Sequence, residues 1–349
     1  MIHNFQALRA LAALLVVFVH IELLARPLGL TDADLIFGNV GVDLFFVLSG
    51  FVIVHSVMKR DQSAAEFARN RIIRVVPLYW VLTLGLFAVA LAAPTLLNST
   101  QADWGDLMKS LAFIPYRKAN GLIHPVLFVG WTLNYEMFFY LIFAAALALA
   151  GGTARRAAPL ASAALLLFVG AVQWAQPDSL VLRFFGDTIV LEFLLGMWIA
   201  LLTRRGIGIA PPIAAAMLVV AGGWLIVSMA VVPEGPRWIF GGIPAAIVLI
   251  AALALEGRGH ALNNPKVQLL GGASYALYLS HPFVLQAIGK FVAPFNNASI
   301  AAPAILFAIV VAQIVGVAIH LWLEKPMVEA LRRCRHRPPS RHAVPNGQS

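Results

Sequence analysis

The sequence has few charged residues and almost no cysteine. Only 12% of its 349 residues are Asp, Glu, Lys or Arg, about half the fraction that soluble domains carry. This shortage excludes a protein whose whole surface faces water. The single cysteine, Cys334, excludes an intrachain disulfide and a cysteine-based metal cluster.

Apolar residues are abundant instead. They make up 60% of the chain, and the mean hydropathy is +0.84. One bilayer-spanning helix needs about 20 predominantly apolar residues. The sequence therefore predicts an all-α, polytopic membrane helix bundle of about ten transmembrane helices in residues 1–325, with no room for a second, soluble domain. The predicted spans are residues 5–25, 35–57, 75–97, 124–150, 157–175, 181–203, 210–232, 237–255, 267–293 and 300–323.

Basic residues are divided unequally between the predicted loops. The chain has 25 Lys and Arg against 16 Asp and Glu, a net charge of +9. With the N-terminus inside, 18 of these 25 residues fall on the cytoplasmic side and 6 on the opposite side, as the positive-inside rule requires. We therefore expect both termini to be cytoplasmic, with no nucleic-acid partner needed to explain the charge. Residues 326–349 are predicted to be a basic, disordered cytoplasmic tail.

Ionisable residues inside the predicted spans are functional candidates, because charges are expensive in a bilayer. Arg9 and His20 are eleven residues apart, so on one helix they share a face and lie about 16 Å apart along the axis. A neutral imidazole can act as a base near pH 7. The alternative is an arginine that snorkels to the interface and an unrelated core histidine.

The second and fourth spans carry carboxylates. Asp43 lies in GVDLFFVLSGFVIVHS together with Ser49 and Gly50, small residues that also permit close helix packing. Glu136 lies in WTLNYEMFFY, at a depth that we expect to be comparable with that of His20. A carboxylate beside an imidazole would fix its tautomer and stabilise the imidazolium form.

Two further motifs contain candidate residues. Arg71 and Arg74 lie three apart in RNRIIRVVPLYW, on one helical face at the expected cytoplasmic boundary, where Pro77 marks the turn into the span. Arginines suit phosphate groups, although the positive-inside bias alone would also place them here. Ser280 and His281 come directly before a proline in SYALYLSHPF.

Together and in this order, these segments resemble the acyltransferase 3 family of integral-membrane acyltransferases, particularly short members that O-acetylate bacterial exopolysaccharide. The motifs that carry the resemblance extend from about residue 5 to 325 and are FQALRALAALLVVFVH, GVDLFFVLSGFVI, RNRIIRVVPLYW, WTLNYEMFFY, VLEFLLGMWIA and SYALYLSHPF. The resemblance implies a bacterial inner-membrane enzyme that moves an acyl group from cytoplasmic acyl-CoA to a hydroxyl, usually on a polysaccharide or lipid-linked sugar. It also implies acetyl-CoA as the donor, and no metal is expected.

The resemblance assigns roles to five residues. His20 matches the essential histidine of the family, and Arg9 matches its partner arginine. Arg71 and Arg74 match the basic pair, and Glu136 matches the glutamate of the fourth-helix motif. We expect the three arginines to hold the phosphates of coenzyme A while its pantetheine arm, roughly 15–20 Å long, reaches His20 over a similar separation.

His20 is then the expected general base, oriented by Glu136 or Asp43, for attack of the acceptor hydroxyl on the thioester. The residues fit direct transfer and an acyl-histidine relay equally. A secondary transporter or flippase for a lipid-linked sugar, with buried His, Asp and Glu as a proton relay, is the alternative from another class. The duplicated halves typical of such transporters are absent from this sequence. Three residues are expected to support the substrate: Ser49, Ser280 and His281.

Overall fold

A computed structural model describes residues 2–97, 101–231, 235–295 and 297–333. In these residues the chain folds into helices and forms no strand, which confirms the predicted all-α fold. The helices of eight or more residues are α1 (His3–Val19), α4 (Val40–Lys59), α5 (Ala64–Ala92), α6 (Trp104–Leu111), α7 (Trp131–Leu149), α8 (Ala154–Ala175), α10 (Glu192–Leu202), α11 (Pro211–Val231), α12 (Ile243–Gly257), α13 (Pro265–Val292), α14 (Ala298–Ile319) and α15 (Lys325–Arg333). The short helices are α2 (Glu22–Ala25), α3 (Asp32–Leu35) and α9 (Leu180–Phe185), and π-helical turns form η7 (Trp238–Gly242) and η9 (His320–Glu324).

Eight helical segments in the described part of the chain are long and apolar enough to cross a membrane. The pair His3–Val19 and Glu22–Leu28, bent by 58°, makes a ninth if it is one span. The remaining predicted crossing corresponds to α13, whose 28 residues give a length of about 42 Å. Its polar side chains keep it below the hydropathy of a typical span, and it packs between α1 and α14.

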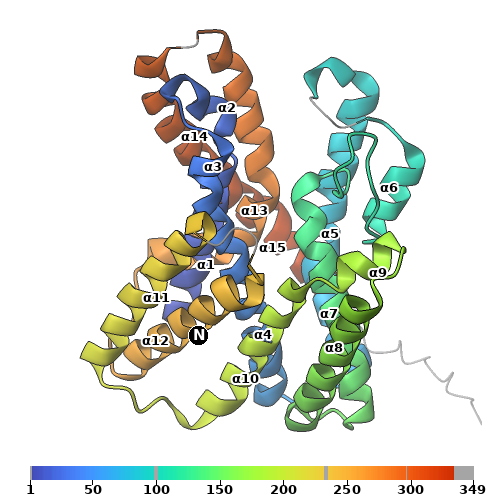
Figure 1. Ribbon diagram of the computed structural model, residues 1–349, viewed down its shortest axis with the longest axis vertical. Helices are drawn as coiled ribbons and strands as arrows, with labels where there is room; N and C mark the ends of the chain where they lie inside the picture. Colours follow the sequence, from blue (N-terminus) through green and yellow to red (C-terminus); the bar gives the residue numbers. More distant parts are fainter. Residues whose placement is uncertain (1, 98–100, 232–234, 296, 334–349) are drawn as a thin grey trace, which may run out of the picture.

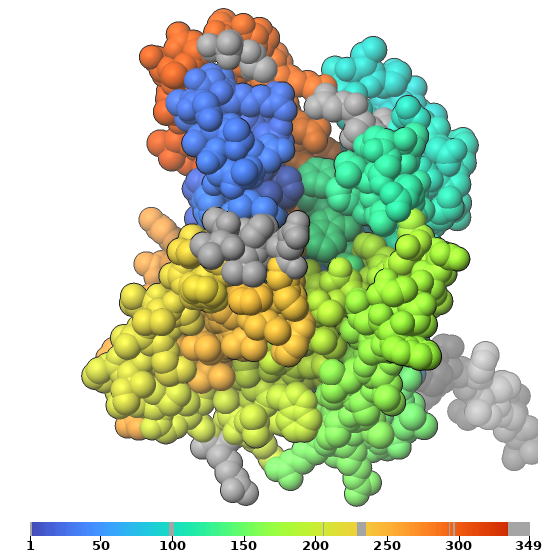
Figure 2. All heavy atoms as spheres, viewed as in Figure 1, coloured from blue at the N-terminus to red at the C-terminus, as the bar shows by residue number. Residues whose placement is uncertain are grey.

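The bundle has two groups of helices (Figure 1). In one group α13 packs against α1 and α14, and in the other α7 packs against α5 and α8. α4 contacts α1, α7 and α10, and thereby connects the two groups. In the space-filling view, green side chains of the segment around α7 are set back between the blue region of α1 to α3 and the cyan region of α6 (Figure 2).

Glycines allow α4 and α10 to approach closely. A Cβ atom on Gly50 would overlap the backbone carbonyl of Phe193, and a Cβ atom on Gly196 would overlap the carbonyl of Val47. Small residues at such crossings are typical of membrane helices, where close packing replaces hydrophobic driving force. The packing interpretation of Gly50 is therefore confirmed.

The entry into the third span differs from the prediction. α5 runs without interruption from Ala64 to Ala92 and contains Pro77, instead of turning into the membrane there. Its N-cap is Ser63, whose hydroxyl accepts from the backbone N–H of Glu66 at 3.1 Å. A proline removes one helical hydrogen bond, and membrane helices tolerate that loss where neighbouring groups compensate. Arg71 and Arg74 therefore lie within a continuous helix.

The C-terminal boundary also differs from the expected one. The helix does not stop near residue 325 but continues through η9 and α15 to Arg333. The rest of the predicted tail, including Cys334, lies outside the described residues.

Candidate active site

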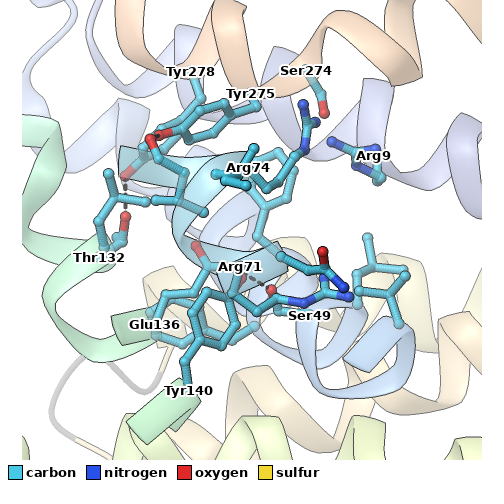
Figure 3. Close-up of a pocket in the computed structure, with 18 of the residues that line it drawn as sticks. Arg9, Ser49, Arg71, Arg74, Thr132, Glu136, Tyr140, Ser274, Tyr275 and Tyr278 are labelled. Carbon is cyan, nitrogen blue, oxygen red and sulfur yellow. Dashed lines mark hydrogen bonds between the residues drawn. The ribbon is translucent and has the colours of Figure 1, made fainter. Parts of the chain in front are cut away.

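A cavity of about 580 Å³ lies among α1, α4, α5, α7 and α13 (Figure 3). Its volume is in the range of small-molecule and cofactor sites. Aromatic side chains such as Phe45 and Phe46 form part of the wall. The charged lining residues are mainly cationic: Arg9, Arg60, Arg69, Arg71, Arg74 and Arg332, with Glu66 and Glu136. The cavity is thus suited to an anionic ligand.

The exposed arginines of this lining mark the mouth of the cavity. Arg60, Arg69 and Arg332 are exposed, whereas Arg71 and Arg74 are partly buried deeper along α5. The three exposed residues were not among the predicted site residues. Their positions in sequence suggested only a positively charged loop and tail, and the fold brings them to one opening.

Arg71 and Arg74 have different partners although they lie one turn apart. Arg74 forms an ion pair with Glu324, whose side chain is 1% exposed, and its guanidinium lies 5.6 Å from the centre of the Tyr275 ring. Glu324 also contacts His320 Nδ1 at 2.7 Å. Arg74 is therefore already neutralised by a buried carboxylate.

Arg71 and Arg9 retain unused donors. Arg71 donates from one terminal nitrogen to Ser56 Oγ at 3.0 Å, and its buried Nε has no hydrogen-bond partner within the described residues. Arg9 donates to Gln6 Oε1 at 3.3 Å. Since a guanidinium has five N–H donors, both residues can bind additional acceptors in the cavity.

Glu136 faces the cavity, not His20. It lies one turn from Thr132 and one turn from Tyr140 on α7, and all three line the cavity. Ser49 Oγ donates to Glu136 Oε1 at 2.7 Å, and the Tyr140 hydroxyl donates to the same oxygen. Ser49 and Glu136 thus line the same cavity as Arg9, Arg71 and Arg74.

His20 lies at the break between α1 and α2. Its backbone N–H donates to the Val17 carbonyl at 3.1 Å, which leaves the Val16 carbonyl to contact the side-chain Nδ1 at 2.9 Å. His20 Nδ1 also lies 3.1 Å from Nε2 of His281. The two imidazole rings have centroids 5.0 Å apart, so the histidines of the first and ninth predicted spans form a pair.

The expectation that Glu136 or Asp43 orients His20 is corrected by these contacts. Within the described residues neither carboxylate has a hydrogen bond to His20. Asp43 is fully buried and accepts two hydrogen bonds from Arg237, at 2.8 and 3.1 Å. Similar depth in the membrane was the basis of the expectation, but depth does not determine which side of the bundle a side chain faces.

Neither histidine lines the cavity, but Tyr278 lies close to both the cavity and His281. It lines the cavity, and its ring centre lies 6.1 Å from that of His281. Its hydroxyl lies 2.7 Å from Thr132 Oγ1 and donates to the Val129 carbonyl at 2.8 Å. Ser280, also a predicted candidate, is buried, and its hydroxyl has no hydrogen-bond partner in the part of the chain that the structure describes.

His20 also contacts an aromatic residue close to the loop before α7. The Phe128 ring lies 5.1 Å from the His20 ring and 6.3 Å from the His124 ring. Burial, and then the nearby charge of Lys118, lowers the pKa of His124, which keeps this loop histidine neutral near pH 7. His20 thus lies between the cavity and this loop.

Several residues at the site were not predicted. Tyr275 and Tyr278 share the SYALYLSHPF motif with His281, and their spacing of three could have placed them on one helical face. Arg237 and Glu324 gave no comparable signal, because each comes far from its partner in sequence. No group of three or more His, Cys, Asp or Glu residues among the described positions could hold a metal ion.

These features define a polytopic membrane protein with an arginine-lined cavity and, next to the wall residue Tyr278, a histidine pair. The chain belongs to the acyltransferase family whose domain model, Acyl_transf_3, matches residues 2–321. It is therefore a membrane acyltransferase, as the motifs implied.

The chain is similar to proteins whose names refer to exopolysaccharide production and to acyl transfer. The exopolysaccharide production protein ExoZ of Rhizobium meliloti (strain 1021) is 34% identical over 309 residues, covering 86% of this chain and 92% of the relative. The acyltransferase MdmB of Streptomyces mycarofaciens is 29% identical over 330 residues, covering 85% of this chain and 83% of the relative. No solved structure matches the chain significantly.

Proposed function

We propose that this protein transfers an acetyl group from cytoplasmic acetyl-CoA to a hydroxyl of a carbohydrate, either an extracytoplasmic polysaccharide or a lipid-linked sugar. One observation carries the proposal: Tyr278, which lines the arginine-rich cavity, lies next to the pair formed by His20 and His281. The exopolysaccharide name of a relative that aligns with 86% of the chain supports a carbohydrate acceptor.

The donor would enter through the mouth formed by Arg60, Arg69 and Arg332, with its phosphates held by the unused donors of Arg9 and Arg71. The pantetheine arm would follow the cavity toward Tyr278. Arg9 lies inside α1 and His20 is the C-cap of that helix, so the two are about 16 Å apart by helix rise, which suits an arm of roughly 15–20 Å. Arg74, paired with Glu324, would contribute mainly to the shape of the cavity.

The acceptor would approach His20 from the side of Phe128 and His124. His20 accepts the proton of the acceptor hydroxyl, and the oxygen forms a bond to the thioester carbon. The carbon–sulfur bond then breaks, and the leaving thiolate receives the proton from His20, so that free coenzyme A and an O-acetyl ester are produced. His20 thus takes up one proton and returns it within each turnover.

The decisive experiment is turnover by the purified protein in lipid nanodiscs with acetyl-CoA and a polysaccharide or lipid-linked acceptor, followed by release of free coenzyme A. His20→Ala should lower kcat by at least about 10²-fold, the usual contribution of a general base. His55→Ala is the matched control, because His55 stacks on Phe51 in α4, away from the cavity wall. Unchanged turnover in His20→Ala would overturn the mechanism.

Two further outcomes concern the alternatives. Acetylated His20 trapped in the absence of acceptor would replace direct transfer by an acyl-histidine relay. Absence of turnover with every acyl-CoA tested, together with proton-coupled sugar movement, would favour the transporter alternative. Reporters in the loops at residues 98–123 and 203–209 test the proposed orientation, since they should lie on opposite sides of the membrane.

A further inference from the structure

The contacts of the two histidines restrict where their protons lie. His281 is fully buried on α13, and its Nδ1 lies 3.2 Å from the Leu277 carbonyl. His20 Nδ1 lies 2.9 Å from the Val16 carbonyl and 3.1 Å from His281 Nε2. A carbonyl oxygen only accepts hydrogen bonds, and a neutral imidazole has one N–H and one bare nitrogen.

One assignment satisfies all three contacts. With the proton of His281 on Nδ1, the ring donates to Leu277 and presents a bare Nε2 to His20. With the proton of His20 on Nδ1, that N–H is shared between the Val16 carbonyl and His281 Nε2. The opposite assignment would place lone pairs against both carbonyls. The bare nitrogen of His20 is therefore Nε2.

We infer that His281 is a positioning residue that, as a neutral hydrogen-bond acceptor, holds His20 in its Nδ1–H tautomer and so leaves Nε2 free to act as the base. This inference rests on the proposed function of His20. When Nε2 takes the proton of the acceptor hydroxyl, the Nδ1–H of the resulting imidazolium donates a charge-assisted hydrogen bond to His281. His281 itself neither gains nor loses a proton.

A neutral partner suits this position. A buried carboxylate would stabilise the imidazolium more strongly, but it would cost several kcal/mol to desolvate in the resting state. His281 is 0% exposed and carries no charge in the assigned form. Pro282 follows it in α13 and removes the N–H that would otherwise bond the Tyr278 carbonyl, so the helix at His281 offers acceptors rather than competing donors.

Two substitutions of His281 distinguish its hydrogen-bond contact with His20 from its contact with Leu277. His281→Gln can place an amide oxygen at the position of Nε2 and thus keep the contact to His20. His281→Asn reaches only the position of Nδ1, keeping the contact to Leu277 and losing the one to His20. We expect kcat of His281→Gln to stay within about threefold of the native protein and that of His281→Asn to fall about 10²-fold. The KM for acetyl-CoA should change little in both, because His281 is not part of the cavity wall.

Nitrogen-15 NMR of the native protein with labelled histidine reads the tautomer directly. The inference requires His20 to carry its proton on Nδ1 in the native protein and in His281→Gln, and to show a mixture of tautomers in His281→Asn. A native His20 protonated on Nε2, or a fully active His281→Asn, would overturn it. If both variants misfold, the native spectrum still decides.

The same data distinguish this inference from the proposed function. Full turnover by His20→Ala would show that His20 is not the base, whichever tautomer it adopts. An inactive His20→Ala together with a fully active His281→Asn would leave the acyltransferase mechanism in place and refute the role of His281 alone.

Discussion

Arg71→Gln should weaken donor binding without harming the fold. The substitution removes a guanidinium that donates to Ser56 Oγ at 3.0 Å. Ser56 also donates to the Ile53 carbonyl at 2.8 Å, so its hydroxyl stays bonded in the variant. No buried carboxylate depends on Arg71 for an ion pair within the described residues. The consequence should therefore fall on the ligand.

The size of the effect follows from the contact that would be lost. A hydrogen bond to a charged group contributes about 1.5–3 kcal/mol, and 1.4 kcal/mol corresponds to a tenfold change in affinity. If Arg71 binds one phosphate oxygen of the donor, the KM of the Arg71→Gln variant for acetyl-CoA should rise about 10- to 150-fold. The kcat at saturation should change little, since the interaction is equal in the ground state and the transition state.

A shortened donor identifies the group that Arg71 binds. Acetyl-pantetheine has the thioester and the arm but none of the phosphates, so its KM should be the same for the native protein and Arg71→Gln. Arg258→Gln, at the end of α12 and outside the cavity wall, controls for the loss of a positive charge. An equal rise of KM for both donors, or none for acetyl-CoA, would refute the phosphate role.

Two other substitutions test the packing around the site. Arg74→Gln leaves the buried Glu324 without its main counter-charge, which should cost about 3–5 kcal/mol and lower the midpoint of thermal unfolding in detergent. Adding Glu324→Gln should restore most of the lost stability. A double variant as unstable as the single one would contradict the structural role of the ion pair. Gly196→Ala should also lower that midpoint, by an amount equivalent to about 1–3 kcal/mol of overpacking, because the new Cβ atom would overlap the Val47 carbonyl. Gly170→Ala, with no atom within 4 Å of its Cβ position, is the control, and equal shifts in the two variants would argue against close packing of α4 and α10.

Much of the cavity could be predicted from sequence because charges inside an apolar span are rare and costly. Motif and span position indicate Arg9, Ser49, Arg71 and Glu136, and the structure brings all four to one cavity. The helical period would have added Tyr140, one turn beyond Glu136. These predictions succeed because each uses only local geometry along one helix.

The partners across helices could not be predicted in the same way. Counting residues from the end of a span gives the depth of a side chain but not its direction, and depth is the only basis for expecting Glu136 beside His20. The structure instead shows Glu136 bonded to Ser49 and His20 bonded to His281, which is 261 positions away in sequence. The spacing of residues along the sequence does not predict that α13 packs beside α1.

The break in α1 and the orientation of His20 have a common cause. Because the backbone N–H of His20 bonds Val17 instead of Val16, the helix ends there and frees the carbonyl that anchors the imidazole. The second anchor comes from His281, three residues after Tyr278, on the helix that closes the cavity. One helix thus supplies both a wall residue of the arginine-lined cavity, Tyr278, and the partner of His20, so the relative positions of the cavity and the histidine are preorganised. In the proposed mechanism, these two anchors hold a histidine at a helix end precisely enough for it to act as the base.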